Sequence, residues 1–155
     1  MGRVTSLFAR KVAAEAGGGG KAGPLLATLG LELEARVDPT FMIPAADYYA
    51  FFERAAAADP DPTTLPLRVG ATMRADDYGP FGFAWKSAPT LGGSYERAAR
   101  FALVLTSVSG YRVEKYFGGA FMHLHREGER RLGMRLSNEA TLASIVAISR
   151  EVSSP

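Results

Sequence analysis

The sequence predicts an α+β fold, with several helices packed against a small antiparallel β-meander in one domain. Two observations lead to this prediction. Apolar residues recur at helical spacing as far as residue 105, and from residue 111 the spacing changes to the alternation that is typical of strands. The chain has 155 residues, 47% of them hydrophobic, which is long enough to bury one core.

The first predicted element is an amphipathic helix on which Val4, Leu7, Phe8 and Val12 share one face. Four glycines at 17–20 follow it and precede Lys21, but the Gly-Lys-Ser/Thr sequence of a phosphate-binding loop is absent. We interpret the glycines as a flexible linker. Residues 1–23 are therefore expected to form a helix and linker, and residues 24–155 to form the main domain.

Proline residues mark the next helices. A short helix is predicted to start at Pro24 and to close at Gly30. A longer helix starts at Pro44 and ends at the Asp-Pro-Asp-Pro run of 59–62, because proline and the residue before it both resist helical geometry. Its core-facing residues are Tyr48, Phe51, Phe52 and Ala55. Residues 65–73 are predicted to form another short helix.

Residues 78–91, Tyr-Gly-Pro-Phe-Gly-Phe-Ala-Trp-Lys-Ser-Ala-Pro-Thr-Leu, are aromatic yet interrupted by glycine and proline. Pro80 fits the first turn of a helix, Pro89 enforces a break, and the Thr90 hydroxyl can cap a second helix. The apolar face of that second helix is formed by Leu91, Tyr95, Ala98, Ala102 and Leu105. Glu96, Arg97 and Arg100 are expected to face water.

Two glycines, Gly118 and Gly119, separate the alternating segments 111–117 and 120–127 and predict a β-hairpin. A second turn, at residues 128–129, is predicted to lead to a third strand at 132–136. Ser137 is then expected to cap a buried helix. The apolar residues of this helix are Leu142, Ile145, Val146 and Ile148.

Two-residue turns fix the register of the predicted meander, because facing positions in a hairpin sum to a constant. Residues 117 and 120 face each other, as do residues 127 and 130. Glu114 then lies opposite His123, and Arg112 lies opposite His125. One face of the meander carries Arg112, Glu114, Tyr116, Phe121, His123, His125, Leu132, Met134 and Leu136.

Three interpretations of Glu114, His123 and His125 remain open. They are cross-strand neighbours on a partly wet sheet face, ligands of a metal ion, or polar groups of a small-molecule pocket with an apolar wall. Phe81, Phe83 and Trp85 likewise fit an ordinary core, although Trp85, the one tryptophan, needs a partner for its indole N–H when buried. The predicted ligand-binding residues are Phe81, Phe83, Trp85, Tyr95, Glu114, His123 and His125.

Several segments together carry a family resemblance. Besides residues 78–91, these are Ile43-Pro44 with Tyr48-Tyr49, then residues 67–70, 136–140 and 149–151. They resemble the N-terminal effector domain of AraC-type transcription regulators, in the arabinose-binding-like subgroup, over residues 25–154. The resemblance implies a bacterial regulator that binds a small organic effector and pairs as a homodimer, with residues 24–155 as its effector-binding and dimerisation domain. It also implies that DNA is bound only through a C-terminal helix-turn-helix domain, which this chain is expected to lack, together with the end of the effector domain.

Composition excludes several other functions. A net charge of +2 argues against a nucleic-acid footprint, and the absence of cysteine excludes a thiolate nucleophile and a Cys-ligated zinc. No Gly-x-Ser-x-Gly sequence is present and no carboxylate pair stands in an obvious cleft, so we do not expect an enzyme. No cofactor is expected, and no metal ligands are assigned, because two histidines are weak evidence for a metal site. Arg10 and Lys11 interrupt any signal-peptide core, and no run is long enough to span a membrane, so a cytoplasmic protein is expected. The alternative function is an interaction module that pairs subunits without a ligand.

Overall fold

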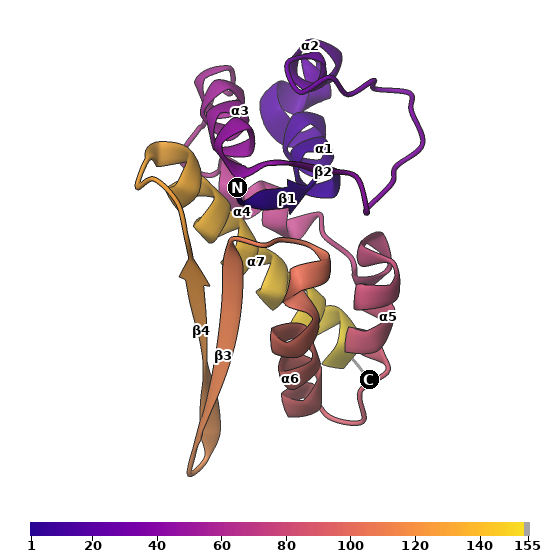
Figure 1. Ribbon diagram of the computed structural model, residues 1–155, viewed down its shortest axis with the longest axis vertical. Coiled ribbons are helices and arrows are strands. Elements are labelled where there is room, and N and C mark those ends of the chain that lie inside the picture. Colours follow the sequence, from indigo (N-terminus) through magenta and orange to yellow (C-terminus); the bar gives the residue numbers. More distant parts are fainter. Residues whose placement is uncertain (154–155) are drawn as a thin grey trace.

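The computed structural model describes residues 1–153 and confirms the α+β class. The described residues contain seven α-helices and two antiparallel two-stranded sheets (Figure 1). The helices are α1 (Ser6–Glu15), α2 (Ala22–Ala27), α3 (Ala45–Ala57), α4 (Leu65–Ala71), α5 (Pro80–Lys86), α6 (Leu91–Phe101) and α7 (Leu132–Ser153). The strands are β1 (Arg3–Thr5), β2 (Met42–Pro44), β3 (Ser109–Tyr116) and β4 (Gly119–Arg126). Short 3₁₀ helices cover Ala16–Gly19, Ala75–Tyr78 and Ala102–Val104.

Strand β1 occupies residues that were predicted to belong to the first helix. Val4 pairs with Ile43 of β2 and is fully buried, so it reaches the core from a strand. Helix α1 begins at Ser6, because Thr5 has an extended backbone and its side-chain oxygen accepts a hydrogen bond from the N–H of Leu7 at 3.3 Å. The helical prediction for Val4 is therefore wrong, since an N-cap separates Val4 from the helix.

The glycine run expected to be a flexible linker forms a tight turn instead. Gly17 and Gly18 have φ values of 57° and 69°, a region that favours glycine. The N–H of Gly17 donates a hydrogen bond to Asp59 Oδ2 at 2.8 Å, and Asp59 also forms an ion pair with Arg68 at 2.6 Å. This turn joins α1 to α2, and both helices contribute to the same core.

The local signals around proline and threonine are confirmed in the central helices. Pro44 is the N-cap residue of α3, and Pro80 is the first residue of α5. Thr90 caps α6, because its side-chain oxygen accepts a hydrogen bond from the N–H of Gly93 at 3.0 Å. The predicted break between α5 and α6 is therefore correct, and it places the two helices side by side (Figure 1).

The predicted β-hairpin is confirmed, but its register differs by two residues. Tyr116 pairs with Gly119, so the turn residues are Phe117 and Gly118. Gly118 has a φ of 93°, whereas within residues 1–153 no residue other than glycine has a positive φ, so this turn needs one glycine and not two. Arg112 consequently lies opposite His123, and Glu114 lies opposite Phe121, in place of the predicted pairs.

The predicted third strand, residues 132–136, is wrong, because these residues form the first turns of α7. Ser137, the predicted cap, is a buried residue inside this helix. The helix starts at Leu132 because the Glu53 carboxylate of α3 accepts a hydrogen bond from the N–H of Gly133 at 2.8 Å. Glu53 is also bound by Arg131, with nitrogen–oxygen distances of 2.7 and 2.6 Å. The cap therefore comes from another helix.

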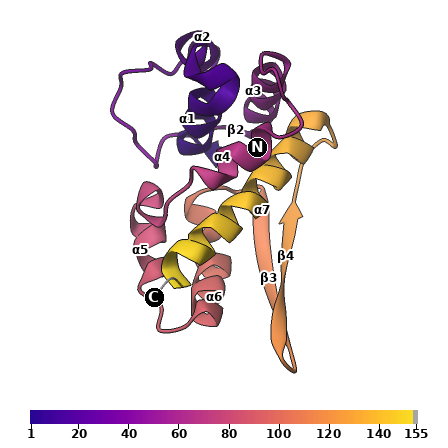
Figure 2. The ribbon, with the colours of Figure 1, turned by 180° about the vertical axis from the view of Figure 1, so that it is seen from behind.

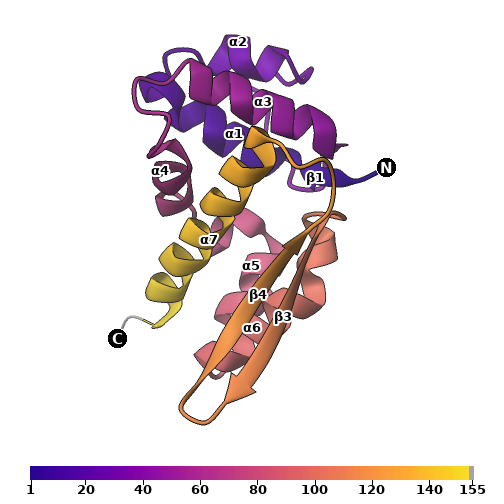
Figure 3. The same cartoon turned by 90° about the vertical axis from the view of Figure 1, so that its left-hand side faces the viewer.

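Two groups of buried side chains lie along the molecule. The first core is built mainly from α1, α2 and α3, with residues of α4 and α7. The second core, which contains Met73, Tyr78, Phe81, Trp85 and Ile148, lies between α5, α6 and α7. Helix α7 runs from the α3 end of the molecule to the α5–α6 end (Figure 2). The β3–β4 hairpin lies along α6, and its tip extends beyond that helix (Figure 3).

Candidate functional site

The structure divides the predicted ligand-binding residues between two places. Glu114, His123 and His125 lie on the hairpin, on one face of the β3–β4 sheet, as predicted. Phe81, Phe83, Trp85 and Tyr95 lie on α5 and α6. The face of the hairpin that packs against the second core is the opposite one, because Met122 contacts that core whereas His123 and His125 are exposed. The cavity predicted between the histidines and Trp85 is therefore not formed by the described residues.

The exposed hairpin face carries a small ionic cluster. Glu114 Oε2 accepts a hydrogen bond from Arg112 Nη1 at 3.1 Å, and a hydrogen bond of 3.0 Å joins it to His123 Nε2. The hydrogen bond with His123, followed by the contacts with Arg112, holds the pKa of the Glu114 carboxyl below its usual range. Because the side chains of His123 and Glu114 are 45% and 54% exposed, this cluster faces solvent.

Metal binding by this cluster gains no support from the geometry. Within residues 1–153, no group of three or more His, Asp or Glu side chains is placed to hold a metal ion. Whether Glu114, His123 and His125 bind a ligand stays a prediction.

Among the described residues 1–153, no helix is long and apolar enough to cross a membrane.

The aromatic residues of α5 lie on two sides of the helix. Phe81 and Trp85 are buried, whereas Phe83 is 68% exposed. The rings of Trp85 and Tyr95 meet edge to face at 6.2 Å, and the Tyr95 hydroxyl is 2.9 Å from Ser149 Oγ of α7. The indole N–H of Trp85 has no hydrogen-bond partner among the described residues, although the side chain is only 4% exposed. A buried donor without a partner costs about 1 to 3 kcal/mol.

An open groove lies between the outer sides of α5 and α6, and we call it the α5–α6 groove. Its principal lining residues are Phe83, Pro89, Thr90, Arg97, Arg100 and Phe101. Its volume is about 650 Å³, which falls in the range of small-molecule sites. Apolar rings and guanidinium groups therefore share one depression, and Trp85 is not among its lining residues.

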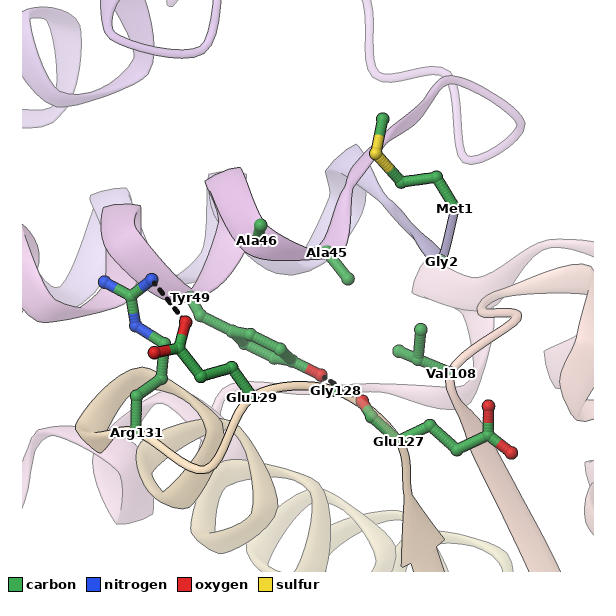
Figure 4. Close-up of a pocket in the computed structure, with 10 residues that line it drawn as sticks. All are labelled: Met1, Gly2, Ala45, Ala46, Tyr49, Val108, Glu127, Gly128, Glu129 and Arg131. Carbon is green, nitrogen blue, oxygen red and sulfur yellow. Dashed lines mark hydrogen bonds and ion pairs between the residues drawn. The ribbon is translucent and has the colours of Figure 1, made fainter.

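A second pocket is more enclosed but smaller, with a volume of about 170 Å³ (Figure 4). Ala45, Ala46 and Tyr49 of α3 form one wall, and residues 127–131 form the opposite wall. The Tyr49 hydroxyl donates a hydrogen bond of 3.4 Å to the carbonyl of Glu127, as Figure 4 shows. This pocket has room for a handful of water molecules, so the α5–α6 groove is the better site for an organic ligand.

Of the residues that line the groove, Phe83 was predicted from the sequence to bind a ligand. Arg97 and Arg100 were expected to face water, and Phe101 was not assigned a role. A signal for them exists, because residues spaced by three or four positions share one face of a helix. Arg100 lies over the ring of Phe101, with 5.4 Å between the guanidinium carbon and the ring centroid. The helical pattern alone could not show that α5 lies beside this face.

The sequence matches the model of a known protein family. A family model described as "Arabinose-binding domain of AraC transcription regulator, N-term" matches residues 19–155. The match covers most of the chain and includes the hairpin and the α5–α6 groove, but not β1 or α1. No curated protein matches the sequence.

Proposed function

We propose that this chain, which belongs to the family of N-terminal arabinose-binding domains of AraC transcription regulators, senses a small effector and helps to pair subunits. The family is a regulatory, ligand-binding family and not an enzyme family. Sequence recognition of DNA is then the task of a separate DNA-binding domain of the regulator. In this proposal, effector binding at α5 and α6 changes the position of that domain relative to DNA.

The observations that carry this proposal are the α5–α6 groove, which Phe83 lines from α5, and the unpaired indole of Trp85, which is buried in the second core on another side of the same helix. Buried polar groups nearly always have partners, so a buried donor without one points to a missing acceptor. A ligand that enters the groove and moves α5 slightly away from α6 gives the indole N–H an acceptor. Phe83 on the outer side of α5 provides an apolar contact for the same ligand.

A screen of metabolites by thermal shift tests the proposal. A ligand at a hundred times its dissociation constant adds about 2.7 kcal/mol to the free energy of unfolding. We expect the same ligand to change the fluorescence of Trp85, the one tryptophan of the chain. The Trp85→Phe variant keeps a ring but loses the donor, so its thermal shift should be smaller.

The His123→Ala variant is the matched comparison, because it tests the predicted role of the hairpin face. If the ligand-induced thermal shift is smaller in His123→Ala but unchanged in Trp85→Phe, the ligand binds at the hairpin and not at α5. A screen without any hit, on a protein that still self-associates, favours the alternative function of an interaction module without a ligand.

For subunit pairing, we propose the tip of the hairpin as the contact between two copies. Phe117 is fully exposed, and Tyr116 and Phe121 are 54% and 60% exposed, with 5.0 Å between the centroids of those two rings. Exposed aromatic side chains gathered at one place mark protein interfaces. The two strands also present unpaired backbone edges that a second hairpin can pair with.

We expect the protein to be a dimer whose dissociation constant rises at least about tenfold in the Phe117→Asp variant, because a charge is buried in the interface. Light scattering over a dilution series measures this. The control is Leu103→Asp, which changes another largely exposed apolar residue, outside the hairpin. Equal effects of the two substitutions, or a monomer at every concentration of the unchanged protein, contradict the proposal.

A further inference from the structure

The α5–α6 groove carries more positive than negative charge, because Arg97 and Arg100 line it together with one acidic residue. Arg97 Nη1 donates hydrogen bonds to the carbonyl of Ala84 at 2.8 Å and to Ser87 Oγ at 2.9 Å, and both acceptors are neutral. Arg100 has no acidic partner among residues 1–153. The one acidic residue that lines the groove, Glu96, forms an ion pair with Lys115 of β3.

Arg97 and Arg100 are three positions apart on α6 and therefore neighbours on one face of the helix. Like charges at this spacing repel each other, and an anion bound between them removes the repulsion. A guanidinium group binds a carboxylate through two parallel hydrogen bonds, and this geometry is stronger than a contact between neutral groups. The groove is thus prepared for an anionic group.

The side-chain hydroxyl oxygens of the groove are already partly engaged in hydrogen bonds within the protein. The Thr90 side-chain oxygen already accepts a hydrogen bond from Gly93, and Ser87 Oγ accepts one from Arg97. The charged donors of the groove are those of its two arginines, which donate hydrogen bonds and cannot accept them. Phe83, Pro89 and Phe101 add apolar surface next to these donors.

We infer that the ligand of the α5–α6 groove is a small organic anion, a carboxylate carried on an aromatic or aliphatic body, bound by Arg97 and Arg100. The inference rests on the proposed effector-sensing function and names the class of effector. The carboxylate lies against the two guanidinium groups, and the apolar body lies over Phe83 and Phe101.

Matched probes test the charge requirement. Phenylacetate and 2-phenylethanol share a ring and a two-carbon side chain and differ mainly in charge. Binding of each at millimolar concentration is measured by saturation-transfer NMR and by Trp85 fluorescence, at constant ionic strength. We expect phenylacetate to bind at least about tenfold more tightly, since one carboxylate–guanidinium contact is worth about one factor of ten.

The variant Arg100→Gln removes one charge at an exposed position and is expected to fold. It should weaken phenylacetate binding about tenfold and leave 2-phenylethanol binding within about twofold. Arg36→Gln, which removes an exposed arginine outside the groove, is the control and should change neither. Thermal unfolding of both variants verifies that they are folded.

Equal affinity for the acid and the alcohol, or equal effects of Arg100→Gln and Arg36→Gln, overturns the inference. Failure of phenylacetate, octanoate and indole-3-acetate all to bind overturns it as well. In each of these cases, the effector-sensing function still holds if the metabolite screen finds an uncharged ligand whose thermal shift depends on Trp85. Absence of hits in both experiments rejects that function too.

Discussion

Replacing Gly82 with alanine is expected to lower the free energy of unfolding by at least about 3 kcal/mol. Gly82 lies inside α5, where the helix passes over the backbone of the 3₁₀ turn Ala75–Tyr78. A Cβ atom at this position would lie 1.6 Å from the carbonyl oxygen of Ala75 and 2.6 Å from its carbonyl carbon. Because both atoms belong to the backbone, no side-chain rotation can relieve the overlap, and α5 must move.

Gly92→Ala is the matched control, since Gly92 is also a helical glycine but has nothing within 4 Å of the position of a Cβ atom. Alanine favours helix formation over glycine, so this variant should have unchanged stability or gain up to about 1 kcal/mol. Urea unfolding of the two variants and the unchanged protein gives the comparison. Equal stability of Gly82→Ala and Gly92→Ala would show that α5 does not pack this closely on the turn.

The same substitution connects packing to the site. Helix α5 carries Phe83 toward the groove and Trp85 toward the second core, so a displaced α5 changes both positions together. If Gly82→Ala still folds, its Trp85 fluorescence should differ from that of the unchanged protein, whereas that of Gly92→Ala should not. A loss of stability without a change in fluorescence would place the strain away from the aromatic cluster.

Elements with local signals could be predicted from the sequence. Pro44, Pro80 and Thr90 act on residues within one helical turn, and the starts of α3, α5 and α6 follow from them. The start of α7 could not be predicted, because its cap is Glu53, 80 residues away from Gly133 along the chain. Strand β1 likewise depends on pairing with β2, and three residues are too few to show a strand pattern.

The candidate site could be predicted only in part for a similar reason. Alternation along β3 and β4 correctly grouped Glu114, His123 and His125, but it cannot say which face of a hairpin meets the core. The structure settles this through Met122, which packs on the second core. From the sequence, the arginines of α6 were expected to face solvent. The position of α5 beside them depends on packing between helices, and the spacing of residues along one helix does not show it.

Replacing Glu53 with glutamine is expected to lower the free energy of unfolding at neutral pH by about 2 kcal/mol. Glutamine can still accept the hydrogen bond from Gly133, but it removes the charge that Arg131 contacts through two hydrogen bonds. The control is Glu139→Gln in the exposed pair with Arg135 on α7. Such a pair contributes less than about 0.5 kcal/mol, so the control should remain close to the unchanged protein.

The effect of Glu53→Gln should depend on pH in a defined direction. Hydrogen bonds from Arg131 are the main cause that lowers the pKa of Glu53 from 4.5 to about 2. A carboxyl with a lowered pKa in the folded state stabilises the fold above its unfolded pKa, and this contribution is lost as the pH falls toward the folded pKa. The stability difference between the unchanged protein and Glu53→Gln should therefore be constant above about pH 5.5 and shrink between about pH 5 and pH 2.

Urea unfolding at several pH values measures this difference directly, because every other titrating group is common to the two proteins. A difference that stays the same down to about pH 2.5 would mean that Glu53 is not ionised against Arg131 in the folded state. Since the same carboxylate caps α7, the pH at which the difference disappears also marks where the start of α7 loses its charged cap. Helix α7 contributes residues to both cores. A less stable start of α7 is therefore expected to affect α5 and α6, and with them the α5–α6 groove.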